Sequence, residues 1–136
     1  MTEASPGVRE RPLSPHIQVW RWHVTMLGSI LHRACLFGLY GGALMLAGWA
    51  VALASGEQAY LAYVSLLGSL PGKLVLLGLT FALFFTIASN VRHLLWDTGR
   101  AFTPKVADMI TIASIVFAVV ATTGVWVIAG QTGGLS

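Results

Sequence analysis

The fold is decided by stretches such as residues 109–130, MITIASIVFAVVATTGVWVIAG, which carry no formal charge over twenty-two positions. A helix needs about 20 apolar residues to cross the hydrocarbon core of a bilayer. Two similar stretches lie upstream, twenty residues from Cys35 to Ala54 and eighteen from Leu74 to Val91. We therefore predict an all-α integral membrane protein with three transmembrane helices, at about residues 30–54, 73–95 and 108–130.

The composition supports this class. The 136 residues are 56% hydrophobic and only 10% charged, and the mean hydropathy is +0.76. A soluble domain carries about 25% charged residues, so an ordinary soluble enzyme and a disordered protein are both excluded. We expect a single membrane-anchor domain over residues 1–136. Residues 1–28 form its polar N-terminal segment and lack the apolar core of a signal peptide, so the first helix is a retained anchor.

The basic residues predict the orientation. Four of the eight Lys and Arg residues precede the first charge-free stretch and three lie between the second and third, whereas only Lys73 lies between the first and second. The positive-inside rule places the N-terminus in the cytoplasm, or in the matrix of an organelle, and the C-terminus in the periplasm. A basic patch with interleaved aromatic residues is absent from the sequence, so nucleic acid is not an expected partner. The seven Lys and Arg residues on the predicted cytoplasmic side are Arg9, Arg11, Arg21, Arg33, Arg92, Arg100 and Lys105.

The segment between the first two spans is long for a simple connection. Its apolar residues from Ala59 to Leu67 suggest a short amphipathic helix lying on the outer membrane surface. Pro71 and Gly72 are expected to break the chain before the second span. The single cysteine, Cys35, is expected to be a small buried apolar residue.

A first polar cluster lies at the start of the first span. Ser29, His32 and Arg33 are three and four positions apart, so they share one face of a helix. A hydroxyl, an imidazole and a guanidinium together could hydrogen-bond a carbonyl or anionic ligand. The alternative is that Arg33 reaches lipid headgroups while Ser29 bonds back to its own helix.

A second polar cluster ends the second span. Asn90, His93 and Asp97 share a face with Thr86, and Arg92 beside them could pair with a carboxylate. The alternative is an interfacial belt. Gly38, Gly41 and Gly42 also form a thin stripe on the first span, where a helix or a flat cofactor could approach closely.

Both clusters carry a resemblance. Residues 11–16, RPLSPH, and 29–33, SILHR, resemble the N-terminal signature of the succinate dehydrogenase cytochrome b556 family, the membrane anchors of respiratory complex II. Residues 92–99, RHLLWDTG, are similar to the family's second signature. The resemblance extends over nearly the whole chain and is strongest to the alphaproteobacterial and mitochondrial branch.

The resemblance implies a function that this chain would carry out together with partner subunits. A family member packs with a second three-helix anchor subunit into a helical bundle and holds an iron–sulfur subunit and a flavoprotein subunit. The complex lies in the lipid of the bacterial inner membrane, or of the mitochondrial inner membrane, and reduces ubiquinone with electrons from succinate. By position, Ser29 and Arg33 match the family's quinone-binding residues. His32, His93 and Asp97 are candidates for a proton path or for contacts with haem propionates.

The sequence departs from the family at the haem. The resemblance places an axial histidine of haem b at the position of Thr86, and threonine is not a competent ligand for haem iron. Asn90 and Leu36 also replace smaller residues of the two signatures. We therefore expect haem b to be absent, or to be held by one axial ligand from the partner, and no other metal site. The Thr86 hydroxyl is expected to donate to the carbonyl of Ala82.

Two other functions stay open at this stage. A degenerate, non-redox membrane scaffold would explain the lost ligand, although it would need neither Ser29 nor Arg33. A fumarate reductase anchor would use the same fold and site in the opposite direction. The chain is expected to act as a subunit, and whether it has activity in isolation is left open.

Overall fold

The computed structural model describes residues 20–99 and 103–133. These residues form four helices and no strand: α1 (Val24–Ala54), α2 (Glu57–Gly68), α3 (Leu70–Asp97) and α4 (Pro104–Gln131). The helices α1, α3 and α4 are long and apolar enough to cross a membrane. The predicted all-α architecture with three spans is therefore confirmed. At 1.5 Å per residue each of the three is over about 40 Å long, more than a hydrocarbon core requires.

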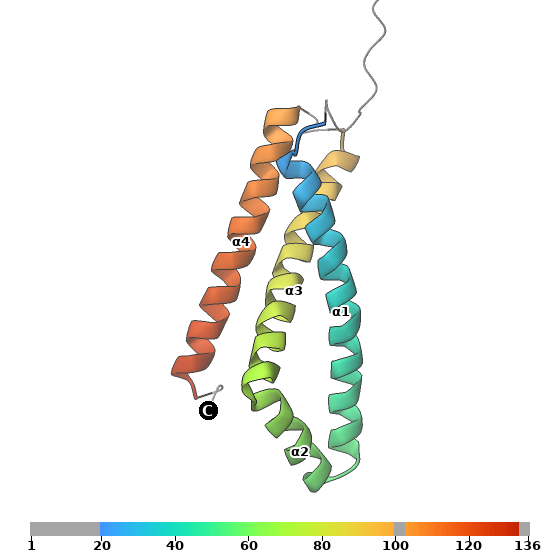
Figure 1. The fold of residues 1–136 in the computed structure, drawn as a ribbon, viewed down its shortest axis with the longest axis vertical. Coiled ribbons are helices and arrows are strands. Elements are labelled where there is room, and N and C mark those ends of the chain that lie inside the picture. Colours follow the sequence, from blue (N-terminus) through green and yellow to red (C-terminus); the bar gives the residue numbers. More distant parts are fainter. Residues whose placement is uncertain (1–19, 100–102, 134–136) are drawn as a thin grey trace, which may run out of the picture.

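The helix α3 lies between α1 and α4 and packs against both (Figure 1). The first turns of α1 and α4 and the last turn of α3 meet at one end of the bundle, called the charged end here. Four of the described basic residues lie at or near this end, and Lys73 lies in the first turn of α3 at the other end. The four are Arg21, Arg33, Arg92 and Lys105.

The predicted helix between the first two spans is present as α2. It follows a sharp turn at Gly56, whose φ of 109° strongly favours glycine. The hydroxyl of Tyr63 then donates to the carbonyl oxygen of Met45 at 2.7 Å. This hydrogen bond holds α2 against the final third of α1, so the segment folds back onto the bundle rather than extending away from it.

The expected chain break at Pro71 and Gly72 is wrong in detail. Both residues lie in the first turn of α3, and the break between α2 and α3 is at Ser69. Proline is tolerated there because first-turn N–H groups have no acceptor within the helix. The Ser69 hydroxyl accepts one such bond, from the backbone N–H of Gly72 at 3.3 Å.

Small side chains fill the interior. The buried apolar core includes Cys35, Ala82, Phe85 and Ala118, which confirms the expectation that Cys35 is buried. Apart from Phe85, which is fully buried, most large apolar side chains are exposed or only partly buried, and Phe37 is 78% exposed. An apolar exterior around a small-residue interior is what a bundle needs when lipid or another membrane subunit surrounds it.

Candidate functional site

Arg92 is the centre of a buried polar network at the charged end. Its side chain is only 2% exposed. One guanidinium nitrogen, Nη1, donates to Oγ1 of Thr111 on α4 at 2.8 Å, and Nη2 donates to Oγ of Ser89 at 3.2 Å. The guanidinium also lies over the ring of Trp96, 4.9 Å from its centroid. Arg92 therefore joins α3 to α4 through the hydroxyl group of Thr111.

The suggested pairing of Arg92 with a carboxylate is not what the structure shows. Asp97 lies five positions later on α3, about 140° around the helix, and its side chain is exposed. No ion pair to Arg92 occurs among the described residues, and its Nε atom is buried without a hydrogen-bond partner. Hydroxyl oxygens of Ser89 and Thr111 face the guanidinium instead because they lie on the inward faces of α3 and α4.

Gly28 brings α1 into this network. A Cβ atom at Gly28 would lie 2.6 Å from Cγ2 of Thr111 and 3.1 Å from Nη1 of Arg92. The first distance is shorter than carbon atoms tolerate, so only glycine fits here while Thr111 and Arg92 stay in place. The three long helices therefore meet at Gly28, which sequence reasoning did not single out.

The structure also brings together two histidines from the separate sequence clusters. The ring centroids of His32 on α1 and His93 on α3 are 5.4 Å apart, and His93 packs edge-on against Trp96. The Nε2 atom of His32 is buried and has no hydrogen-bond partner among the described residues. Of the three predicted proton-path residues, His32 and His93 therefore lie next to each other. Asp97 is exposed at the C-terminal end of α3. His16 lies outside the described residues.

Ser29 and Arg33 lie one helical turn apart near the start of α1. Ser29 is half-buried and Arg33 is exposed. Neither side chain forms a hydrogen bond or ion pair with another residue in the described part of the chain. The alternative in which the Ser29 hydroxyl bonds back to its own helix is therefore not observed. Both groups therefore keep their hydrogen-bonding capacity for a partner other than these described residues.

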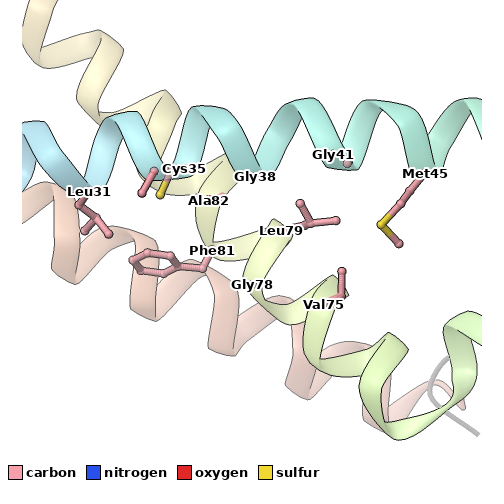
Figure 2. Close-up of a pocket in the computed structure, with 12 residues that line it drawn as sticks. Leu31, Cys35, Gly38, Gly41, Met45, Val75, Gly78, Leu79, Phe81 and Ala82 are labelled. Atoms are coloured by element: carbon pink, nitrogen blue, oxygen red, sulfur yellow. The ribbon is translucent and has the colours of Figure 1, made fainter.

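An apolar groove of about 570 Å³ runs between α1 and α3 (Figure 2). The predicted glycine stripe lines it, and the side chains of Cys35 and Met45 supply its sulfur atoms. A Cβ atom added at Gly38 or Gly41 would meet nothing within 4 Å. The stripe is thus open at these two positions and is not used to pack this chain's own helices there.

The groove and the Ser29–Arg33 pair lie on nearly opposite sides of α1. At about 100° per residue, the α1 residues that line the groove centre roughly 160° away from the pair. The groove also offers no hydroxyl, amide or cationic side chain that could bind a quinone carbonyl. It is therefore not the head-group site that Ser29 and Arg33 would form.

Thr86 lies inside the bundle, where its side chain is 7% exposed. Its Oγ1 is buried and has no hydrogen-bond partner in the described chain, so the expected bond to the carbonyl of Ala82 is wrong. That carbonyl already accepts the backbone N–H of Thr86 in the helix, and the second bond is optional. Thr80 and Thr111 do form such bonds, to Leu76 and Ala107.

The residues around Thr86 do not fit the axial ligation of a haem. A neutral hydroxyl replaces the imidazole that the family resemblance calls for. His93 lies seven residues further along α3, about 10.5 Å along the axis, at a different membrane depth. Among the described residues, no group of three or more His, Cys, Asp or Glu side chains is close enough to hold a metal ion.

Comparison with known proteins identifies the family of this chain. The chain is 28% identical over 118 residues to the succinate dehydrogenase cytochrome b556 subunit of Rickettsia felis, covering 87% of this chain and 92% of that protein. It is 32% identical over 119 residues to the mitochondrial succinate dehydrogenase cytochrome b560 subunit of Mus musculus, covering 84% and 69%. Residues 8–125 match the model of the succinate dehydrogenase/fumarate reductase transmembrane subunits. The chain therefore belongs to the family of succinate dehydrogenase/fumarate reductase transmembrane subunits.

Proposed function

We propose that this chain is a membrane anchor of succinate:ubiquinone oxidoreductase and forms part of its ubiquinone-reduction site. The flavoprotein subunit would oxidise succinate, and the iron–sulfur subunit would pass the electrons to the membrane. One observation carries the proposal furthest. Ser29 and Arg33 adjoin on α1 near the charged end, and their side chains have no hydrogen-bond partner among the described residues.

These two groups suit the chemistry of quinone reduction. The Ser29 hydroxyl would donate a hydrogen bond to one carbonyl oxygen of ubiquinone. The Arg33 guanidinium would stabilise the negative charge that develops on that oxygen as electrons arrive, as donors do in an oxyanion site. Two electrons and two protons convert the quinone to the quinol. His32 and His93, 5.4 Å apart, and Asp97 are the proposed route for those protons.

The apolar groove suits the proposed second anchor subunit. Close approach of membrane helices depends on small residues, because no hydrophobic driving force acts between helices in lipid. Gly38 and Gly41 leave open space along α1, and Gly78 does so along α3. We propose that a helix of the second three-helix anchor packs here, on the side of α1 away from the quinone-binding residues.

The charged end is proposed to face the cytoplasm, or the matrix in an organelle. Four of the five described Lys and Arg residues lie at or near this end, and the positive-inside rule assigns such an end to the cytoplasm or matrix. This orientation places the N-terminus in the cytoplasm and the C-terminus in the periplasm. It also puts Ser29 and Arg33 on the side where the iron–sulfur and flavoprotein subunits would dock. The membrane would be the bacterial inner membrane, or the mitochondrial inner membrane.

Isolation of the complex tests the proposed function. A complex purified through a tag on this chain should contain a flavoprotein, an iron–sulfur protein and a second three-helix protein, and should reduce ubiquinone with succinate. The measurement is subunit identification by mass spectrometry together with a quinone-reduction assay. A flavoprotein-containing complex without quinone reductase activity would support the non-redox scaffold instead. A complex that reduces fumarate with quinol much faster than it oxidises succinate would favour a fumarate reductase.

Haem b is proposed to be absent from this anchor or abnormally ligated. The buried hydroxyl of Thr86 at the family's axial position supports this. The reduced-minus-oxidised absorption spectrum of the purified complex should lack the signal of a normal six-coordinate b-type haem. A pyridine haemochrome assay would measure the haem content per flavin. A normal spectrum with one haem per complex would contradict the proposal.

A further inference from the structure

The contact of α1 with the other two long helices at the charged end depends on the absence of a single side chain. A Cβ atom at Gly28 would lie 2.6 Å from Cγ2 of Thr111 and 3.1 Å from Nη1 of Arg92. Two different helices therefore press on the same point of α1. We refer to Gly28, Arg92 and Thr111 as the Gly28 contact.

The partners of Gly28 are themselves held in place. Arg92 is 2% exposed and donates to Ser89 and Thr111, both of which are fully buried. The Thr111 hydroxyl in turn donates to the carbonyl of Ala107 at 2.8 Å. Both side chains that face Gly28 are thus restrained by hydrogen bonds, and neither can move aside without losing a buried bond. A side chain larger than hydrogen at position 28 must displace α1 instead.

We propose that the Gly28 contact positions Ser29 and Arg33 for quinone binding, an inference that rests on the proposed function. Ser29 is the next residue along the chain, and Arg33 lies five residues on, about 7.5 Å along α1. Seating α1 against Arg92 and Thr111 sets the depth and rotation of both donors. Gly28, Arg92 and Thr111 are positioning residues, because they act on the quinone through the backbone of α1.

The first test is the Gly28→Ala variant of the intact complex. The added methyl group pushes α1 away from Thr111, and a displacement of about 1 Å at a binding group can cost up to about 100-fold in activity. We expect the KM for ubiquinone to rise about tenfold or more, while succinate oxidation by an artificial electron acceptor is unchanged. Gly124→Ala on α4 is the matched control, because a Cβ atom there meets nothing within 4 Å.

A second substitution distinguishes positioning from general destabilisation. Thr111→Ser removes Cγ2, the atom nearest to an added Cβ at Gly28, and keeps the hydroxyl that accepts from Arg92. The double variant Gly28→Ala with Thr111→Ser should recover most of the wild-type KM. A general structural role would instead lower the amount of assembled complex and leave the KM of each assembled complex unchanged.

If the complex with Gly28→Ala does not assemble, Thr111→Val is a second test of the proposed positioning. Valine retains the shape of threonine but removes the acceptor of Arg92 Nη1. A raised KM in this variant supports the proposal, and a wild-type KM overturns it. A wild-type KM in an assembled Gly28→Ala complex also overturns the proposed positioning. If Arg33→Ala loses quinone reduction at the same time, the proposed function still stands. If Arg33→Ala has no effect either, the proposed role of Arg33 in the quinone site is wrong, and the subunits and quinone reductase activity of the purified complex decide whether the proposed function stands.

Discussion

Replacing Arg33 by alanine should reduce electron transfer from succinate to ubiquinone by about 100-fold or more, the usual cost of removing a donor that stabilises developing negative charge. Oxidation of succinate by an artificial acceptor that takes electrons before the quinone site should be unchanged. The two assays, run on the same purified complex, separate the quinone step from the flavin step. The fold should tolerate the change, because Arg33 is exposed and forms no hydrogen bond or ion pair to another described residue.

Two further variants sharpen this result. Arg33→Lys keeps the charge but loses the planar fork of donors, so its quinone activity should fall between wild type and alanine. Arg21→Ala removes an exposed arginine that precedes α1 near the same end of the bundle and should leave both assays unchanged. Unchanged quinone reduction in Arg33→Ala would show that the assigned role of Arg33 is wrong.

The second large effect is a gain of haem binding. Thr86→His places an imidazole at the position where the family resemblance calls for an axial ligand. We expect the reduced-minus-oxidised spectrum to acquire a low-spin b-type signal that the unmodified complex lacks. Because Thr86 is 7% exposed, the larger ring is expected to lower stability by about 1–3 kcal/mol through overpacking. Adding Leu36→Gly, which restores the family's small residue on α1, should increase haem occupancy.

Ile87→His is the matched control for this experiment. Residue 87 lies next to Thr86 on α3, but its side chain is exposed and points about 100° away. It should yield no six-coordinate signal. Failure of Thr86→His, alone and with Leu36→Gly, to bind haem in an assembled complex would show that this site no longer accommodates the cofactor. The missing axial histidine would then not be the only reason for the proposed absence of haem.

Most of the fold could be read from the sequence, because membrane insertion depends on local properties. Charge-free stretches of eighteen to twenty-two residues require helices, since only internal hydrogen bonds satisfy the backbone in lipid. The apolar residues between Ser55 and Gly72 also predicted α2. The error at Pro71 was small: proline was interpreted as a break, whereas a helix accepts it in its first turn.

The sequence predicted only part of the candidate site. Spacing along one helix placed Ser29 beside Arg33, because periodicity determines which residues share a face. Periodicity does not say which neighbouring helix that face meets. The inward residues of α4 are small, from Ala107 through Thr111 to Thr122, yet nothing in the sequence linked Thr111 to Arg92 or to Gly28.

The sequence by itself therefore determined the number of spans, the concentration of basic residues at one end and the unusual threonine at position 86. Each can be read from the order of residues along the chain, without knowing which helices pack together. The tertiary structure alone decided that Arg92 bonds to hydroxyl groups and that Gly28 is the meeting point of three helices. It also showed that the glycine stripe of α1 lines an open groove against α3. These features depend on how each helix is rotated about its own axis, and that rotation is set by packing between segments distant in the chain.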